Sequence, residues 1–142
     1  MQTSGIAHAI KTVGEDAQRG IEKFLLTEKW DFEKINILGT DYIIKRQTKA
    51  ENPKLENAWG FCEQYSKEIV LDTFDEEKKN VMVVNDFEEF EKKVMRHEII
   101  HAFLGESGLK SNSDWAENEE MVDWFAIQAP KLFKAFKELD LI

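Results

Sequence analysis

The segment His97-Glu98-Ile99-Ile100-His101 places two of the three histidines of this chain four residues apart. On an α-helix, such positions lie ~40° apart around the axis and ~6 Å apart along it, so both rings can point at one metal ion. Glu98 stands beside the first histidine and can act as general base on a metal-bound water. The segment therefore predicts a helix that carries half of a metal site.

The sequence around this segment also favours a helix. Asn85 can cap its start, with Glu88 three residues later as the partner of a capping box, and Gly105 is expected to end it. The same five-residue pattern also occurs in helices with two ordinary buried, hydrogen-bonded histidines. A shared ligand role is favoured here because both histidines fall on one inward stripe with apolar residues at steps of three and four. This stripe consists of Phe87, Phe90, Val94, His97, His101 and Leu104.

The middle of the chain is rich in β-branched residues and predicts strands. Residues 34–49 form one such region, which Gly39-Thr40 interrupts, and the runs 58–64 and 68–72 are typical of a hairpin. A further short strand is expected at 81–84. These segments predict a small, mostly antiparallel sheet.

Helices are expected at both ends of this region. Asp114 can cap a helix that runs to Ala129, and a terminal helix over Lys131–Leu139 would carry Pro130 at its first turn. Residues 1–29 have apolar positions at helical spacing and predict an additional amino-terminal helical segment. Strands followed by helices indicate the α+β class. With 142 residues, of which 42% are apolar, we expect a single domain over 1–142 with its core in 30–142.

The charge and the cysteine content exclude several kinds of site. The formal net charge is -9, without a basic block, so nucleic acid and anionic membranes are not expected as partners. No apolar run approaches the ~18 to 20 residues of a membrane span, and residues 1–10 lack the features of a secretory signal, so a cytoplasmic location is expected. Cys62 is the single cysteine, which excludes a Cys-rich zinc module. The metal ligands must then be histidines and carboxylates.

The third ligand is not fixed by the helix itself. The longer pattern HExxHxxGxxH would need Gly at 104 and His at 107, but Leu104 and Ser107 stand there. His8 could fold back onto the site, although a lone histidine in such a segment is more often an ordinary polar residue. The other candidates are the carboxylates of Asn118-Glu119-Glu120-Met121-Val122-Asp123.

The arrangement Asn118-Glu119-x-x-x-Asp123 after an HExxH segment resembles the second motif of gluzincin zinc peptidases such as thermolysin. The continuation Asp123-Trp124-Phe125-Ala126 is similar to small metallopeptidases of the ImmA/IrrE type, found in prophages and mobile elements. The resemblance implies a minimal zincin-like fold that holds Zn²⁺ through His97, His101 and Glu119. It further implies that Asp123 orients the ring of His97.

Helix geometry supports the same choice among the carboxylates. With ~100° per residue, Val122, Phe125, Ala126 and Ala129 define the apolar face, and Glu119 and Asp123 lie on its shoulder. Glu117, Glu120 and Trp124 are expected to point away from the site.

These features predict a zinc-dependent peptidase that acts on a peptide or protein substrate, with Glu98 as general base. The resembling enzymes use further His and Tyr side chains in the transition state, and the candidates here are Tyr42 and Tyr65. Arg96 is expected to form an ion pair on the outside of its helix. The alternative is a non-catalytic protein-binding module of the same fold, in which the zinc is mainly structural.

Overall fold

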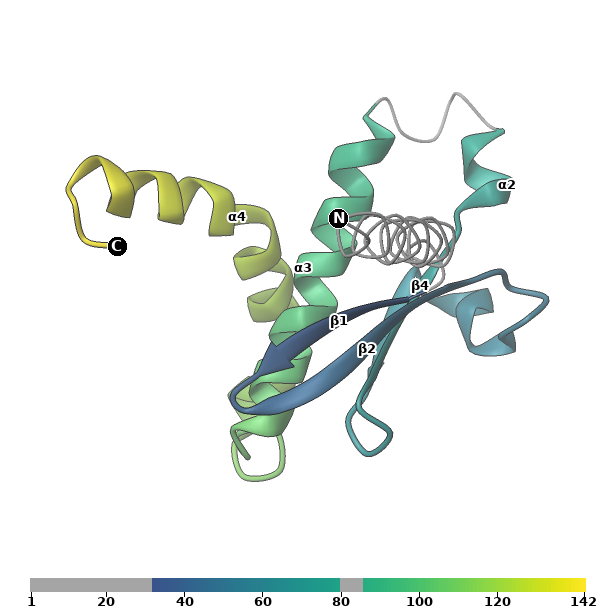
Figure 1. Cartoon of the computed structure of the whole chain (residues 1–142), viewed down its shortest axis with the longest axis horizontal. Coiled ribbons are helices and arrows are strands. Elements are labelled where there is room, and N and C mark those ends of the chain that lie inside the picture. The colour runs from purple at the N-terminus through teal and green to yellow at the C-terminus, as the bar shows by residue number, and fades with distance from the viewer. Residues whose placement is uncertain (1–31, 80–85) are drawn as a thin grey trace, which may run out of the picture. The chain divides into compact units, whose positions relative to one another are not determined.

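The structure is a computed structural model that describes residues 32–79 and 86–142 (Figure 1). The helical segment expected at 1–29, with His8, and the strand expected at 81–84 lie outside these residues. Residues 34–142 form one compact unit, and the single-domain organisation of the whole chain stays a prediction. No helix among the described residues is long and apolar enough to cross a membrane. The described elements are β1 (Phe32–Ile37), β2 (Thr40–Gln47), η1 (Pro53–Asn57), β3 (Gly60–Glu63), β4 (Glu68–Asp72), α2 (Asp75–Lys78), α3 (Phe87–Glu106), η2 (Asp114–Glu117) and α4 (Glu119–Glu138).

The four strands form one mixed sheet in the order β1-β2-β4-β3. Leu38 and Gly39 have φ of 50° and 92°, the left-handed backbone of a two-residue hairpin turn, and they join β1 to β2. β3 and β4 form the expected antiparallel hairpin, with Cys62 opposite Ile69. β4, however, pairs with β2 in parallel, with Ile44 opposite Ile69. The expectation of a mostly antiparallel sheet missed this central pairing, which leaves β3 at one edge.

Helix α3 begins one residue later than predicted. The side chain of Asp86 accepts a hydrogen bond from the backbone N–H of Glu89 at 3.1 Å, so Asp86 is the N-cap. Gly105 does not end the helix. Gly108 lies three residues further on, with φ of 81°, and its left-handed backbone follows the last turn.

Gly105 has a packing role instead. A Cβ atom at this position would lie 3.0 Å from the side chain of Gln64, which donates a hydrogen bond of 2.9 Å to the Gly105 carbonyl. The glycine therefore lets the chain after β3 approach the last turn of α3 closely.

The two helices expected after residue 113 are a short 3-10 helix and one long α-helix. Asp114 begins only η2, and the side chain of Asn118 accepts a hydrogen bond from the N–H of Met121 at 2.8 Å, so α4 starts at Glu119. The helix then continues through Pro130 to Glu138. Figure 1 shows that α4 bends, as expected for a helix with an internal proline.

A tertiary hydrogen bond explains how α4 accommodates Pro130. Proline has no N–H, so the carbonyl of Ala126, four residues earlier, loses its helical partner. Arg96 of α3 supplies the missing donor, because its Nε atom lies 2.6 Å from that carbonyl oxygen. Its guanidinium also pairs with Glu89 at 2.8 Å, so the expected ion pair on α3 is present. Arg96 therefore ties α3 to α4 next to His97.

Two apolar clusters hold α3 in place. The larger lies between the sheet and α3, and the smaller joins α3 to η2 and α4 through Leu104, Ala116 and Val122. One side of α3 thus packs on the sheet and another on α4, which fixes the distance between the two helices. The buried residues of the larger cluster are Ile37, Tyr42, Ile44, Ile69, Leu71, Phe74, Val94 and Ala102.

Candidate metal centre

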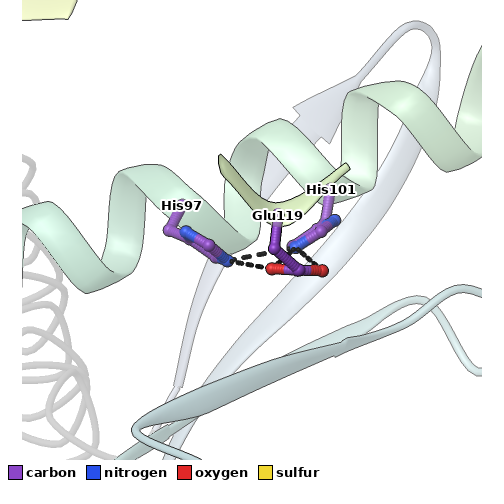
Figure 2. A group of neighbouring side chains, drawn as sticks. All are labelled: His97, His101 and Glu119. Carbon is purple, nitrogen blue, oxygen red and sulfur yellow. Dashed lines mark hydrogen bonds and ion pairs between the residues drawn. The ribbon is translucent and has the colours of Figure 1, made fainter. Parts of the chain in front are cut away.

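Three side chains of the kinds that bind metals converge between α3 and α4. The Nε2 atoms of His97 and His101 are 3.1 Å apart, and the Glu119 carboxylate lies 3.1 Å from the first and 3.3 Å from the second. Figure 2 shows the carboxylate of Glu119 facing both imidazole rings. The three donor atoms lie within 4.8 Å of one another and could hold one metal ion.

The spacing of these atoms fits a tetrahedral ion. Zinc bonds to nitrogen and oxygen are ~2.0 to 2.2 Å long, so two ligands of a tetrahedral zinc lie about 3.3 Å apart. The three separations of 3.1, 3.1 and 3.3 Å are close to this value. Two imidazoles and one carboxylate are also a donor set that zinc accepts while it keeps an open position. The residues present therefore fit a zinc ion, although their role as ligands stays a prediction.

Glu119 reaches the histidines because of where α4 begins. The Asn118 cap makes Glu119 the first residue of the helix, next to α3. Its side chain is 68% exposed, so it approaches the histidines from the solvent side. The neighbouring carboxylates Glu117 and Glu120 are exposed and do not belong to the group.

Asp123, one turn further along α4, contacts the Nδ1 atom of His97, on the edge of the ring away from Glu119. Its Oδ1 atom lies 3.2 Å from His97 Nδ1, and Lys93 forms an ion pair with the same carboxylate. Lys93 and the charge it brings lower the pKa of Asp123, with a smaller contribution from the bond to His97. An ionised carboxylate accepts the Nδ1–H, which leaves the lone pair on His97 Nε2 free to face Glu119.

The side chain of His101 is more buried than that of Glu119, its partner on α4. Burial lowers the pKa of its ring below the usual 6.5, against the opposing charge of Glu119. The neutral ring is the form that can bind a metal. Its Nδ1 atom is buried and has no hydrogen-bond partner among the described residues. The polar contacts of the ring therefore lie on its Nε2 side, toward His97 and Glu119.

Glu98 is buried, with only 5% of its surface exposed. Burial, followed by the negative charge of Glu119, raises its pKa to about 7, and the nearby ammonium groups of Lys110 and Lys93 oppose this shift. Its neighbour on β3 is Gly60, where an added Cβ would lie 3.2 Å from Glu98 Cγ. Glu98 thus fills the space between α3 and β3 and can gain or lose a proton near neutral pH.

These side chains line one cavity of about 450 Å³, a size typical of small-molecule and peptide sites. One wall is the β3 segment at the edge of the sheet, and the opposite wall is formed by α3 and the start of α4. Cys62 lies in the β3 wall. Burial raises the pKa of its thiol to about 11, so it stays protonated at neutral pH. The lining residues are Ala58, Trp59, Gly60, Phe61, Cys62, Lys93, Val94, His97, Glu98, His101, Lys110, Glu119 and Asp123.

The two tyrosines expected to assist catalysis do not line this cavity. Tyr42 is 0% exposed, and its hydroxyl donates a hydrogen bond of 2.9 Å to Glu106. Tyr65 is 99% exposed in the turn between β3 and β4. The structure brings neither candidate to the cavity, because one side chain packs in the core and the other projects into solvent.

Two lysines of the cavity were missed by the sequence reasoning. Lys93 stands four residues before His97 on the same helix, so the helical spacing could have placed it beside the site. Lys110 lies in the loop after α3, where no periodic pattern indicates the direction of a side chain. Trp124 is 52% exposed, in the direction expected from helix geometry.

Comparisons of the chain with protein-family models, with curated proteins and with solved structures give no match. The function must therefore be inferred from the residues of this site. What the chain shows is an α+β fold with a His97, His101 and Glu119 group that could hold a metal ion.

Proposed function

We propose that this protein is a zinc-dependent peptidase with chemistry of the gluzincin type. The observation that carries the proposal is that the His97, His101 and Glu119 group shares one cavity with the buried carboxyl of Glu98. A buried carboxyl that titrates near pH 7 beside such a group is what general-base catalysis requires.

His97, His101 and Glu119 would hold the zinc, and Asp123 would keep His97 in the tautomer that presents Nε2. A bound zinc polarises the scissile carbonyl and lowers the pKa of a coordinated water to about 7. A carboxylate oxygen of Glu98 accepts a proton from the attacking water and then delivers it to the leaving amine. The raised pKa of Glu98 suits both transfers, because neither protonation state is strongly favoured near neutral pH.

The proposed substrate is an extended peptide that lies along β3. This strand is at the edge of the sheet, and its residues form the wall of the cavity opposite Glu98. An edge strand offers unpaired backbone N–H and C=O groups, which can bind a peptide with little demand on its sequence. Trp59 and Phe61 in this wall supply apolar surface for substrate side chains.

The test combines metal analysis with an unbiased peptide-library digest. We expect about one zinc per wild-type chain and cleavage of some library peptides, whereas His97→Ala and His101→Ala should lose stoichiometric zinc. Glu98→Gln should keep the zinc and lose turnover. Glu117→Gln is the matched control, because this carboxylate is exposed and outside the cavity. The proposal would be contradicted if Glu98→Gln turned over substrate at the wild-type rate. It would also be contradicted if the double variant His97→Ala/His101→Ala retained zinc.

A second candidate function is a protein-binding module with a structural zinc. The exposed apolar residues of α4 favour it, and they include Trp124, Phe125 and Phe133. In that case Glu98→Gln would bind its partner as well as the wild type does, and no peptide in the library would be cleaved.

A further inference from the structure

Hydrolysis of a peptide bond places negative charge on the carbonyl oxygen, and hydrogen-bond donors fixed around that oxygen accelerate the reaction. Neither Tyr42 nor Tyr65 lines the cavity. A peptidase at this site therefore needs another donor among the residues that do.

The side chain of Lys110 lies in the wall of the cavity, where it could reach a bound carbonyl oxygen. It is half-buried, lines the cavity, and is close enough to interact electrostatically with Glu98, His101 and Cys62. Its backbone N–H donates to the carbonyl of Leu104 at 3.0 Å, in the loop that folds back on the end of α3. The lysine is thus carried by a hydrogen-bonded loop and not by a loose surface segment.

Its charge is also available. Lys93, the other lysine of the cavity, forms an ion pair with Asp123, whereas Lys110 forms no ion pair within the described part of the chain. Within the described residues its ammonium group makes no ion-pair contact, although it is near enough to Glu98 to favour the charged form of that carboxyl. This group is placed to receive an anion that arrives with the substrate or forms during the reaction.

The remaining donors of the cavity are less suitable. The histidines are engaged with Glu119 and with each other, and the thiol of Cys62 is a weak donor. The ring of Trp59 packs against Phe74 and Phe90. Among the side chains that line the cavity, Lys110 is therefore the charged donor that has no hydrogen-bond or ion-pair partner within the described residues.

We propose that Lys110 is a catalytic residue of the peptidase, whose ammonium group donates a hydrogen bond to the carbonyl oxygen of the scissile peptide bond. This inference rests on the proposed function. The water oxygen bonds to the carbonyl carbon, the C–N bond breaks, and Glu98 carries the water proton to the amine. Lys110 keeps its own proton throughout, so its contribution is electrostatic and is larger in the transition state than in the bound substrate.

The test compares Lys110→Met, Lys110→Arg and the control Lys131→Met, which changes an exposed lysine of α4 outside the cavity. We expect Lys110→Met to lower kcat by about 100- to 1000-fold, with KM changed only a few-fold. Lys110→Arg should recover part of the loss, and all three variants should keep their zinc and their unfolding transition. An unchanged kcat, or an effect confined to KM, would overturn the assignment.

A binding measurement gives a readout that does not depend on turnover. A peptide with a phosphinate in place of the scissile bond carries a tetrahedral anion, and calorimetry should show about 100-fold weaker binding to zinc-loaded Lys110→Met. The matching uncleaved peptide, measured in the Glu98→Gln background with and without Lys110→Met, should bind with affinities that differ only a few-fold. Equal phosphinate affinity would refute the role of Lys110 even in an active peptidase. If the wild type shows no hydrolysis that depends on Glu98, the proposed function itself fails, and this inference falls with it.

Discussion

The bond from Arg96 to the carbonyl of Ala126 makes a quantitative prediction about stability. Arg96→Met removes a charge-assisted hydrogen bond and leaves the carbonyl of a fully buried residue without a donor. Hydrogen bonds to charged groups contribute roughly 1.5 to 3 kcal/mol, and a buried group left unsatisfied costs a similar amount. The pair with Glu89 is exposed and adds at most about 1 kcal/mol. We expect the free energy of unfolding to fall by about 2 to 3 kcal/mol.

The cause can be isolated by a second substitution. Pro130→Ala restores an N–H that can bond the Ala126 carbonyl within α4, and it should itself stabilise the helix by up to about 3 kcal/mol. In this background, Arg96→Met no longer leaves the carbonyl unsatisfied and should cost only about 1 kcal/mol. The double-mutant cycle should therefore give a coupling of about 1 to 2 kcal/mol between residues on different helices.

The assay is urea unfolding of the metal-free chain, so that metal affinity does not enter the comparison. Lys92→Met is the matched control, because Lys92 forms an exposed pair with Glu88 on the same helix. It should change stability by no more than about 0.5 kcal/mol in either background. If Arg96→Met costs the same with Pro130 and with alanine at that position, Arg96 does not replace the missing donor and the reasoning is refuted.

Two further predictions concern the carboxylates at the ends of α3 and α4. In a zinc titration, Glu119→Ala should weaken binding by orders of magnitude and Asp123→Ala by ~10- to 100-fold, whereas the exposed neighbour Glu120→Ala should change it little. The bonds that Glu106 accepts, the first of them from Lys67, lower its pKa from 4.5 to about 2. Its charged form thus stabilises the fold above about pH 4.5, and this contribution is lost as the pH falls toward 2. The thermal unfolding temperature of the wild type should therefore fall more steeply over this pH range than that of Glu106→Gln.

Each of these two predictions has a clear contrary result. A titration in which Glu120→Ala is the severe variant would show that α4 is rotated from the orientation described here. If the wild type and Glu106→Gln lose stability in parallel between pH 4.5 and 2, the bonds to Glu106 do not favour its ionised form.

The parts of the fold that the sequence predicted are local. The two histidines lie on one face of α3, as the spacing of the stripe predicted. That Glu119 faces the site and Glu120 points away follows from the rotation per residue of the single helix α4. Both depend on contacts between residues three or four apart, which a periodic pattern records. The inferred roles of these side chains as metal ligands remain predictions.

The parts that were missed depend on residues far apart in the chain. Pro130 indicated a helix boundary, but a donor from α3 allows the helix to continue. The parallel pairing of β2 with β4 brings together two strands that η1 and β3 separate along the chain, and no local pattern encodes it. Lys110 reaches the cavity through the fold of a loop. Such features are visible only once tertiary contacts are known.

The two walls of the cavity come from separate stretches of the chain. Lys93, Asp123 and the His97, His101 and Glu119 group that could hold a metal ion belong to residues 93–123, whereas the opposite wall is the short run 58–62. Gly60 must stay small beside Glu98, whereas none of the other residues of that run supplies an atom to the His97, His101 and Glu119 group. The residues that shape this wall and the residues that could hold an ion can therefore change separately in the sequence. If the proposed function holds, exchanging residues of this run is the most direct way to change which peptide the cavity accepts.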